Sequence, residues 1–182
     1  AKDTFHPYNN IRVLAAKEHL HIAGNVKQAM NLVDTKFVYV LQHDLAFKLD
    51  IDHTKLVQAM RQHPEKLRNV RFRMRRAHEG NFPYCRVYNH KGKYPEDEYG
   101  GLKLFATARW SDNNQFSTKA YYEELFAMII HLKRPMEAPM MHHATKNCTY
   151  WGQVVYGGRW DERAFLKHLD GRHSHASNET RR

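Results

Sequence analysis

Apolar and polar positions follow different periods along the first third of the chain. Residues 11–16 are apolar except for Arg12, which is typical of a short buried strand. Apolar residues then recur at Val26 and at three, four and seven positions beyond it, which predicts an amphipathic helix. The β-rich segment 36–42 predicts a second strand. Strand, helix and strand in this order indicate a right-handed βαβ unit and therefore a parallel sheet.

The middle of the chain predicts a helix, a strand and a loop. Asp52 or Thr54 is placed to cap a helix that Pro64 would stop. Residues 70–75 alternate between apolar side chains and arginines, which predicts a half-buried strand with a basic face. Residues 77–108 are rich in glycine, proline and acidic residues, and we expect a long irregular loop there.

The C-terminal part predicts two helices separated by a strand. Ser117 or Thr118 would cap the first helix, residues 150–158 would form the strand, and residues 160–169 would form a short closing helix. We expect one α/β domain over residues 1–172 and a disordered, basic tail over residues 173–182.

Composition limits the class of protein. A chain of 182 residues is long enough to bury one core, and 42% hydrophobic residues indicate a folded protein. No apolar run is long enough for a membrane-spanning helix and no secretory signal opens the sequence, so we expect a soluble chain of undetermined compartment. Two cysteines make neither a disulfide framework nor a zinc motif.

The formal charge of +10 favours a partner that carries phosphate: nucleic acid, an anionic membrane surface or a nucleotide. Arg71, Arg73 and Arg75 could follow a nucleic-acid backbone, or they could form a solvated sheet face. No glycine-rich phosphate loop or helix-turn-helix pattern accompanies them. We do not expect nucleic acid as the main partner, and a non-catalytic polyanion-binding module remains an alternative.

His43 and Asp44 interrupt the apolar pattern directly after the second predicted strand. Ligands of parallel sheets gather beyond the carboxyl ends of the strands. A carboxylate beside an imidazole at such a position can bind a divalent cation that also contacts phosphate oxygens. A turn or helix-capping aspartate is the alternative interpretation of Asp44.

A second candidate group lies near the third predicted helix. Asp112 stands between a loop and the start of that helix, where a carboxylate could act as a general base, although residues 111–114 could also be a plain polar turn. Glu123 and Glu124, one helical turn further on, are the next candidates for the same role. Toward the C-terminus, His168 could complete a metal site, and Arg163 or Lys167 could contact a diphosphate.

The stretch "GNVKQAMNLVDTKFVYVLQHDLAF" resembles the nucleotide-sugar half of family 2 glycosyltransferases, which have the GT-A fold. In that family an asparagine-containing helix, a threonine and an apolar strand lead into an Asp-x-Asp-like metal motif. Asn25, Thr35 and residues 42–44 stand at the matching positions, and Asp44 alone keeps an acidic residue of the motif. The resemblance extends loosely over residues 105–172.

The resemblance implies a GT-A-like, Rossmann-like and mostly parallel sheet flanked by helices. It also implies inverting transfer of a sugar from a UDP- or GDP-type donor to a hydroxyl of a glycan or another acceptor. Mn²⁺ or Mg²⁺ would be held by Asp44, His43 and His168. Asp112 would be the catalytic base, with Glu124 as its rival. Asn25, Arg163 and Lys167 would contact the donor.

Only residues 1–10 precede what matches the family's third strand. The resemblance therefore implies that the nucleotide-binding half is N-terminally truncated. An inactive glycosyltransferase fragment is the corresponding alternative, and a metal-dependent phosphohydrolase would need more acidic residues than Asp44 offers.

Overall fold

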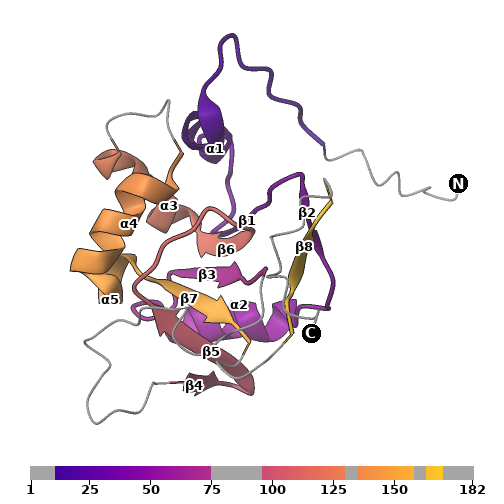
Figure 1. Cartoon of the computed structure of the whole chain (residues 1–182), viewed down its shortest axis with the longest axis vertical. Helices are drawn as coiled ribbons and strands as arrows, with labels where there is room; N and C mark the ends of the chain where they lie inside the picture. The colour runs from indigo at the N-terminus through magenta and orange to yellow at the C-terminus, as the bar shows by residue number, and fades with distance from the viewer. Residues whose placement is uncertain (1–10, 75–95, 130–134, 158–162, 170–182) are drawn as a thin grey trace, which may run out of the picture.

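The computed structural model describes residues 11–74, 96–129, 135–157 and 163–169, which form a mixed sheet with helices on both faces (Figure 1). The six strands lie in the order β1-β6-β3-β7-β5-β4. Their bounds are Phe37–Val40 for β1, Gln115–Thr118 for β6, Asn69–Phe72 for β3, Gln153–Tyr156 for β7, Leu102–Thr107 for β5 and Glu96–Tyr99 for β4.

The sheet is α/β as predicted, but the expectation of mostly parallel strands is wrong. Among the described strands of this six-stranded sheet, only β3 and β7 pair in parallel, and the other four neighbouring pairs are antiparallel. The order and direction of the strands explain the difference. The strands β1, β3 and β7 run in the same direction, but β6 lies between β1 and β3 and runs against both. The strand β5 likewise runs against β7.

Five helices surround the sheet in the described part of the chain: α1 (His21–Met30), α2 (His53–Gln62), α3 (Lys119–Met128), α4 (Glu137–Lys146) and α5 (Cys148–Trp151). Two predicted caps are confirmed. The Asp52 side chain accepts a hydrogen bond from the backbone N–H of Lys55, and Thr118 accepts one from Tyr121. Each cap satisfies a backbone donor that the first helical turn leaves unpaired.

Each face of the sheet has its own apolar core. On one face, Leu56 and Met60 of α2 pack with Val70 and Phe72 of β3. The opposite face is covered by α1, α3 and α4, whose core residues include Ala23, Tyr121, Tyr122, Leu125 and Met140. Since successive strand residues point to opposite faces, Asn69 and Arg71 of β3 face away from α2.

Three predicted elements are wrong. Residues 11–16 form no strand, and Val13 is 84% exposed. The predicted loop over residues 77–108 contains β4 and β5 in its described part. The predicted closing helix is instead strand β8 (Leu166–His168), which pairs with β2 (Leu45–Phe47). The extended conformation of β8 lets the ladder with β2 satisfy its backbone groups.

The predicted basic face of β3 is also wrong. Arg71 and Arg73 are only 6% and 3% exposed, because β3 is a central strand between β6 and β7 with helices over both faces. Arg75 lies outside the described residues. The described arginines of this segment therefore offer no accessible surface to a polyanion.

Several sequence-based expectations fall outside the described residues, among them the tail over residues 173–182. Within the described residues, no helix is both long and apolar enough to cross a membrane. Cys148, at the start of α5, is disulfide-bonded. Thiol chemistry at Cys148 therefore plays no part in the candidate site.

Candidate functional site

The turn after β1 brings Asp44 next to His168. The β2–β8 ladder pairs Leu45 with His168, and the carbonyl of Asp44 accepts a hydrogen bond of 2.8 Å from the N–H of Leu169. As a result, Oδ2 of Asp44 lies 3.6 Å from Nδ1 of His168, with about a quarter of each side chain exposed. Two residues that the sequence predicted as metal ligands are thus neighbours in the fold.

Asn114 ties this turn to the loop before β6. Its Oδ1 accepts a hydrogen bond of 2.7 Å from the backbone N–H of Gln42, and its Nδ2 donates one of 3.1 Å to the carbonyl of Leu45. The Gln42 side chain donates in turn to the carbonyl of Asp112 at 2.7 Å. These three bonds bring the loop that carries Asp112 against the turn that carries Asp44.

Burial and a neighbouring charge raise the pKa of Asp112. Burial raises the pKa of its carboxyl above the ordinary value, and the negative charge of Asp44 raises it further. Hydrogen bonds from its own backbone N–H and from the Gln42 side chain oppose this rise in part. A carboxylate with a raised pKa accepts a proton more readily, as general-base catalysis requires.

Glu137 is a second carboxyl near Asp112 that sequence reasoning missed. Burial raises the pKa of Glu137, the charge of Asp112 raises it further, and Arg71 lowers it. Burial in turn lowers the pKa of Arg71 to about 10, partly offset by Glu137. An acid in the first turn of a helix is an ordinary feature of sequences, so nothing in the local pattern singled out Glu137.

Asp44 in the turn and His168 beside it have side chains that could contribute ligands to a divalent cation. In the described part of the chain, no group of three or more histidine, cysteine and acidic side chains could hold a metal ion alone. Mg²⁺, however, is commonly bound by one or two carboxylates together with water and substrate phosphates. Asp44 supplies a carboxylate and His168 an imidazole nitrogen, while His43 is exposed in the same turn.

The structure does not bring together the three residues that were predicted to contact the nucleotide-sugar donor. Asn25 is exposed on α1 and lines a groove that follows β1 as far as Leu41, next to the turn. Lys167 is exposed on β8 opposite Ala46, one position from His168. Arg163 instead lines a separate cavity of about 480 Å³, whose lining contains neither Asp44 nor His168.

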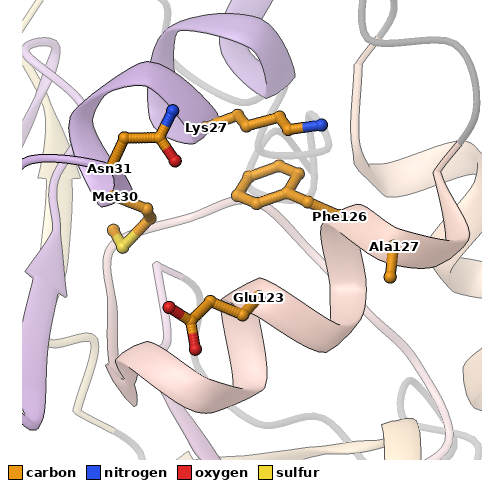
Figure 2. A pocket seen from close by; sticks show the side chains of 6 residues that line it. All are labelled: Lys27, Met30, Asn31, Glu123, Phe126 and Ala127. Carbon is orange, nitrogen blue, oxygen red and sulfur yellow. The ribbon is translucent and has the colours of Figure 1, made fainter.

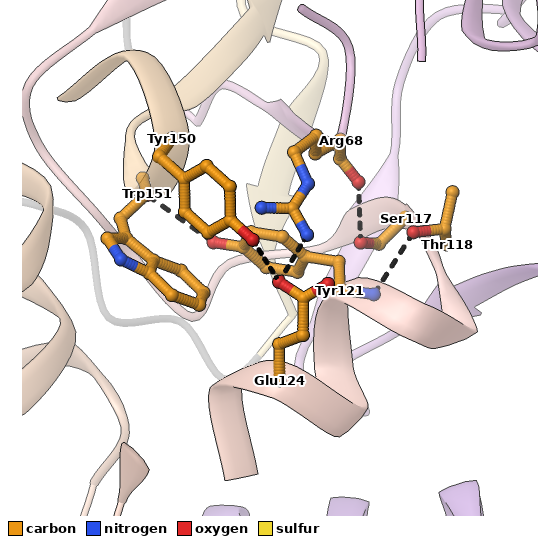
Figure 3. Close-up of polar contacts among 7 residues, drawn as sticks. All are labelled: Arg68, Ser117, Thr118, Tyr121, Glu124, Tyr150 and Trp151. Carbon is orange, nitrogen blue, oxygen red and sulfur yellow. Dashed lines mark hydrogen bonds and ion pairs between the residues drawn. The ribbon is translucent and has the colours of Figure 1, made fainter. Parts of the chain in front are cut away.

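Glu124 belongs to a different cluster (Figure 3). Its carboxylate pairs with Arg68 and accepts a hydrogen bond of 2.8 Å from the hydroxyl of Tyr150. The guanidinium of Arg68 also stacks on the Tyr150 ring, 4.1 Å from its centroid. Although burial raises the pKa of Glu124, the bonds from Arg68 and Tyr150 lower it on balance. A carboxylate held in this way is a poor general base.

A hollow of about 250 Å³ lies between α1 and α3 (Figure 2). Lys27 of α1, Asn31 directly after that helix and Glu123 of α3 supply its polar groups. Met30 and Phe126 supply its apolar wall. None of the predicted site residues lines it. We therefore place the candidate site at the turn after β1, where Asp44 neighbours His168 and hydrogen bonds link the turn to the loop that carries Asp112.

No protein-family model matches this chain, and no curated protein sequence matches it either. The geometry of the site therefore carries the functional argument.

Proposed function

We propose that this chain is a metal-dependent glycosyltransferase domain, which transfers a sugar from a nucleoside diphosphate to an acceptor hydroxyl with inversion. The observation that carries the proposal is that Asp44 lies 3.6 Å from His168, in a turn that hydrogen bonds link to the loop of Asp112. A divalent cation can offset the charge of a diphosphate leaving group, and a nearby carboxylate of raised pKa can accept the proton of the acceptor hydroxyl.

Asp44 and His168 would hold Mn²⁺ or Mg²⁺ against the donor diphosphate. The bound cation would supply a counter-charge for the leaving nucleoside diphosphate. Asp112 would accept the proton of the acceptor hydroxyl. As that proton moves, the acceptor oxygen forms a bond to the anomeric carbon, and the bond from that carbon to the diphosphate oxygen breaks on the opposite face.

The groove beside β1 supports a place for the donor. Asn25, Thr35 and Tyr39 contribute to its lining, and it reaches Leu41, two positions before His43. A nucleotide lying in this groove could extend its diphosphate toward Asp44. The strand β1 is also an edge of the described sheet, so its outer backbone groups are open to the groove. Lys167 would face the diphosphate from β8.

The proposal is tested by calorimetric titration of UDP and of GDP into the purified chain, with and without Mn²⁺. We expect binding of one nucleotide that requires Mn²⁺ and is lost in Asp44→Asn. The matched control is Asp34→Asn, which removes an exposed carboxylate from the link between α1 and β1. Absence of binding in every condition, or equal binding by Asp44→Asn, would contradict the proposal for this chain.

A further inference from the structure

A cluster of three buried amide side chains lies beneath the loop that carries Asp112. Asn69, Gln115 and Gln153 come from the neighbouring strands β3, β6 and β7, and each is at most 1% exposed. The Nδ2 of Asn69 donates to Oε1 of Gln115 at 2.6 Å, and Nε2 of Gln153 lies 3.2 Å from both Oε1 of Gln115 and Oδ1 of Asn69. Amides this deeply buried are stable only when they are hydrogen-bonded.

The cluster binds the backbone of Ser111, the residue before Asp112. Ser111 donates its N–H to Oε1 of Gln153 at 2.8 Å, and Nε2 of Gln153 donates back to the Ser111 carbonyl, also at 2.8 Å. Gln115 adds a bond of 3.0 Å to the same carbonyl. Gln153 therefore holds both polar groups of one backbone residue, as a paired strand would.

The position of Gln153 itself is fixed by the start of β7. Gln153 pairs with Thr107 of β5, and Gly152 precedes it. A Cβ at position 152 would lie 2.5 Å from the carbonyl oxygen of Thr107 and 2.3 Å from that of Cys148, which is closer than real Cβ atoms approach. Glycine thus allows β7 to begin close against β5, with Gln153 directed at the loop.

Asp112 is consequently held on both sides. Gln153 and Gln115 fix the backbone of Ser111 before it, and the side chain of Gln42 donates a hydrogen bond to the backbone carbonyl of Asp112. A misplacement of about 1 Å in a reacting group can cost about a hundredfold in rate, so a base on a loop benefits from such anchoring.

We propose that Gln153, supported by Gln115, is a positioning residue that holds Asp112 in place for proton transfer. The inference rests on the proposed function of Asp112 as the general base. It goes beyond that function because Gln153 lies under the loop and would not touch the donor or the acceptor.

The test compares Gln153→Met with Ser117→Ala in the full chain. Methionine has nearly the size of glutamine but cannot bond to Ser111. Ser117 is fully buried in the same sheet face, donates to the carbonyl of Arg68 and accepts a long bond of 3.5 Å from Asn69. Its substitution therefore removes hydrogen bonds next to the cluster but none of those to Ser111. With UDP-glucose and GDP-mannose as donors, water as the acceptor of the sugar and Mn²⁺ present, release of UDP or GDP by hydrolysis gives kcat and the donor KM.

For Gln153→Met we expect kcat to fall roughly ten- to a hundredfold with the donor KM changed less than about twofold, since the base moves while the donor site stays. We expect Ser117→Ala to keep both values. Equal kcat values in Gln153→Met and Ser117→Ala would overturn the inference. If Gln153→Met does not fold, Gln115→Met takes its place, because it removes one of the two donors to the Ser111 carbonyl. We then expect a smaller loss of kcat in Gln115→Met, and kcat equal to that of Ser117→Ala would overturn the inference.

Amide hydrogen exchange at Ser111 separates this inference from the proposed function, because it needs no substrate. We expect Gln153→Met to speed exchange of the Ser111 N–H more than exchange across β3, whereas Ser117→Ala leaves Ser111 protected. An inactive wild-type chain would contradict the proposed transferase, and the exchange result would still decide whether Gln153 holds the loop. Unchanged protection of Ser111 in Gln153→Met would overturn the inference, whatever the activity.

Discussion

Oδ2 of Asp44 and Nδ1 of His168 lie 3.6 Å apart across the β2–β8 pair. This distance exceeds that of an ordinary hydrogen bond. Two ligands about 2.1 Å from an octahedral cation lie about 3 Å apart, so a small adjustment would bring both atoms to one ion. The backbone bond from Leu169 to Asp44 keeps the two residues adjacent without any contribution from their side chains.

This relationship predicts different effects for the two candidate histidines. We expect His168→Gln to weaken Mn²⁺-dependent nucleotide binding by at least about tenfold. Even substitution of residues that only hydrogen-bond to metal ligands commonly lowers metal affinity about 10- to 100-fold. His43→Gln should have a smaller effect, because its side chain is exposed in the turn. Calorimetry with the nucleotide that binds the wild type measures both. The reverse order of effects would assign the imidazole ligand to His43.

Asp112→Asn should lower turnover by about a hundredfold or more, because general-base assistance is worth about 10²–10⁴. Mn²⁺-dependent nucleotide binding should persist, since Asp112 is not assigned to the cation. In the wild type, kcat/KM should rise with pH through the pKa of Asp112, which burial sets above the ordinary 3.8. The variant should lack this rise. Near-normal turnover of Asp112→Asn would remove Asp112 from the mechanism.

The same substitution should stabilise the fold at neutral pH. Because the folded pKa of Asp112 is raised, this carboxyl favours folding most below its unfolded pKa, and that contribution is lost as pH rises through the folded value. Asparagine does not ionise. The midpoint of thermal unfolding of Asp112→Asn should therefore exceed that of the wild type at pH 7 and converge with it near pH 3. A lower midpoint of thermal unfolding at pH 7 would argue against a carboxylate whose pKa burial raises.

The sequence predicted the proximity of two candidate residues better than it predicted the local structure around them. The resemblance named Asp44 and His168 together, and the structure makes them neighbours, although the helix expected at His168 is a strand. The caps Asp52 and Thr118 were predictable because a cap acts within four residues. By contrast, the apolar run at residues 11–16 is compatible with a strand, but a strand forms only where a partner is available.

Other features required the whole fold. The alternation around Arg71 showed that the two faces of β3 differ, but it could not show that helices cover both of them. Glu137 and Gln153 carry no local pattern. Their proximity to Asp112 arises only when α4 and β7 are placed against the loop. Long-range contacts of this kind are invisible to periodicity.

Glu124 should prove structural and not catalytic. In Glu124→Gln the guanidinium of Arg68 loses its carboxylate partner (Figure 3). The Arg68 side chain is 13% exposed and that of Glu124 is 42% exposed. We expect a loss of about 1 kcal/mol in the free energy of unfolding, discounted for the exposure of Glu124. Turnover should stay near that of the wild type. Chemical denaturation and steady-state kinetics measure the two quantities.

The pH dependence of that loss follows from the lowered pKa of Glu124. A carboxyl whose folded pKa lies below the ordinary 4.5 stabilises the fold above that value, and its contribution is lost as pH falls through the folded pKa. The gap between wild type and Glu124→Gln should thus be full at pH 7 and shrink in acid. Glu123→Gln, which removes an exposed partner of Lys119 on the same helix, is the control and should change stability little. A hundredfold loss of turnover in Glu124→Gln at unchanged stability would instead place Glu124 in the reaction.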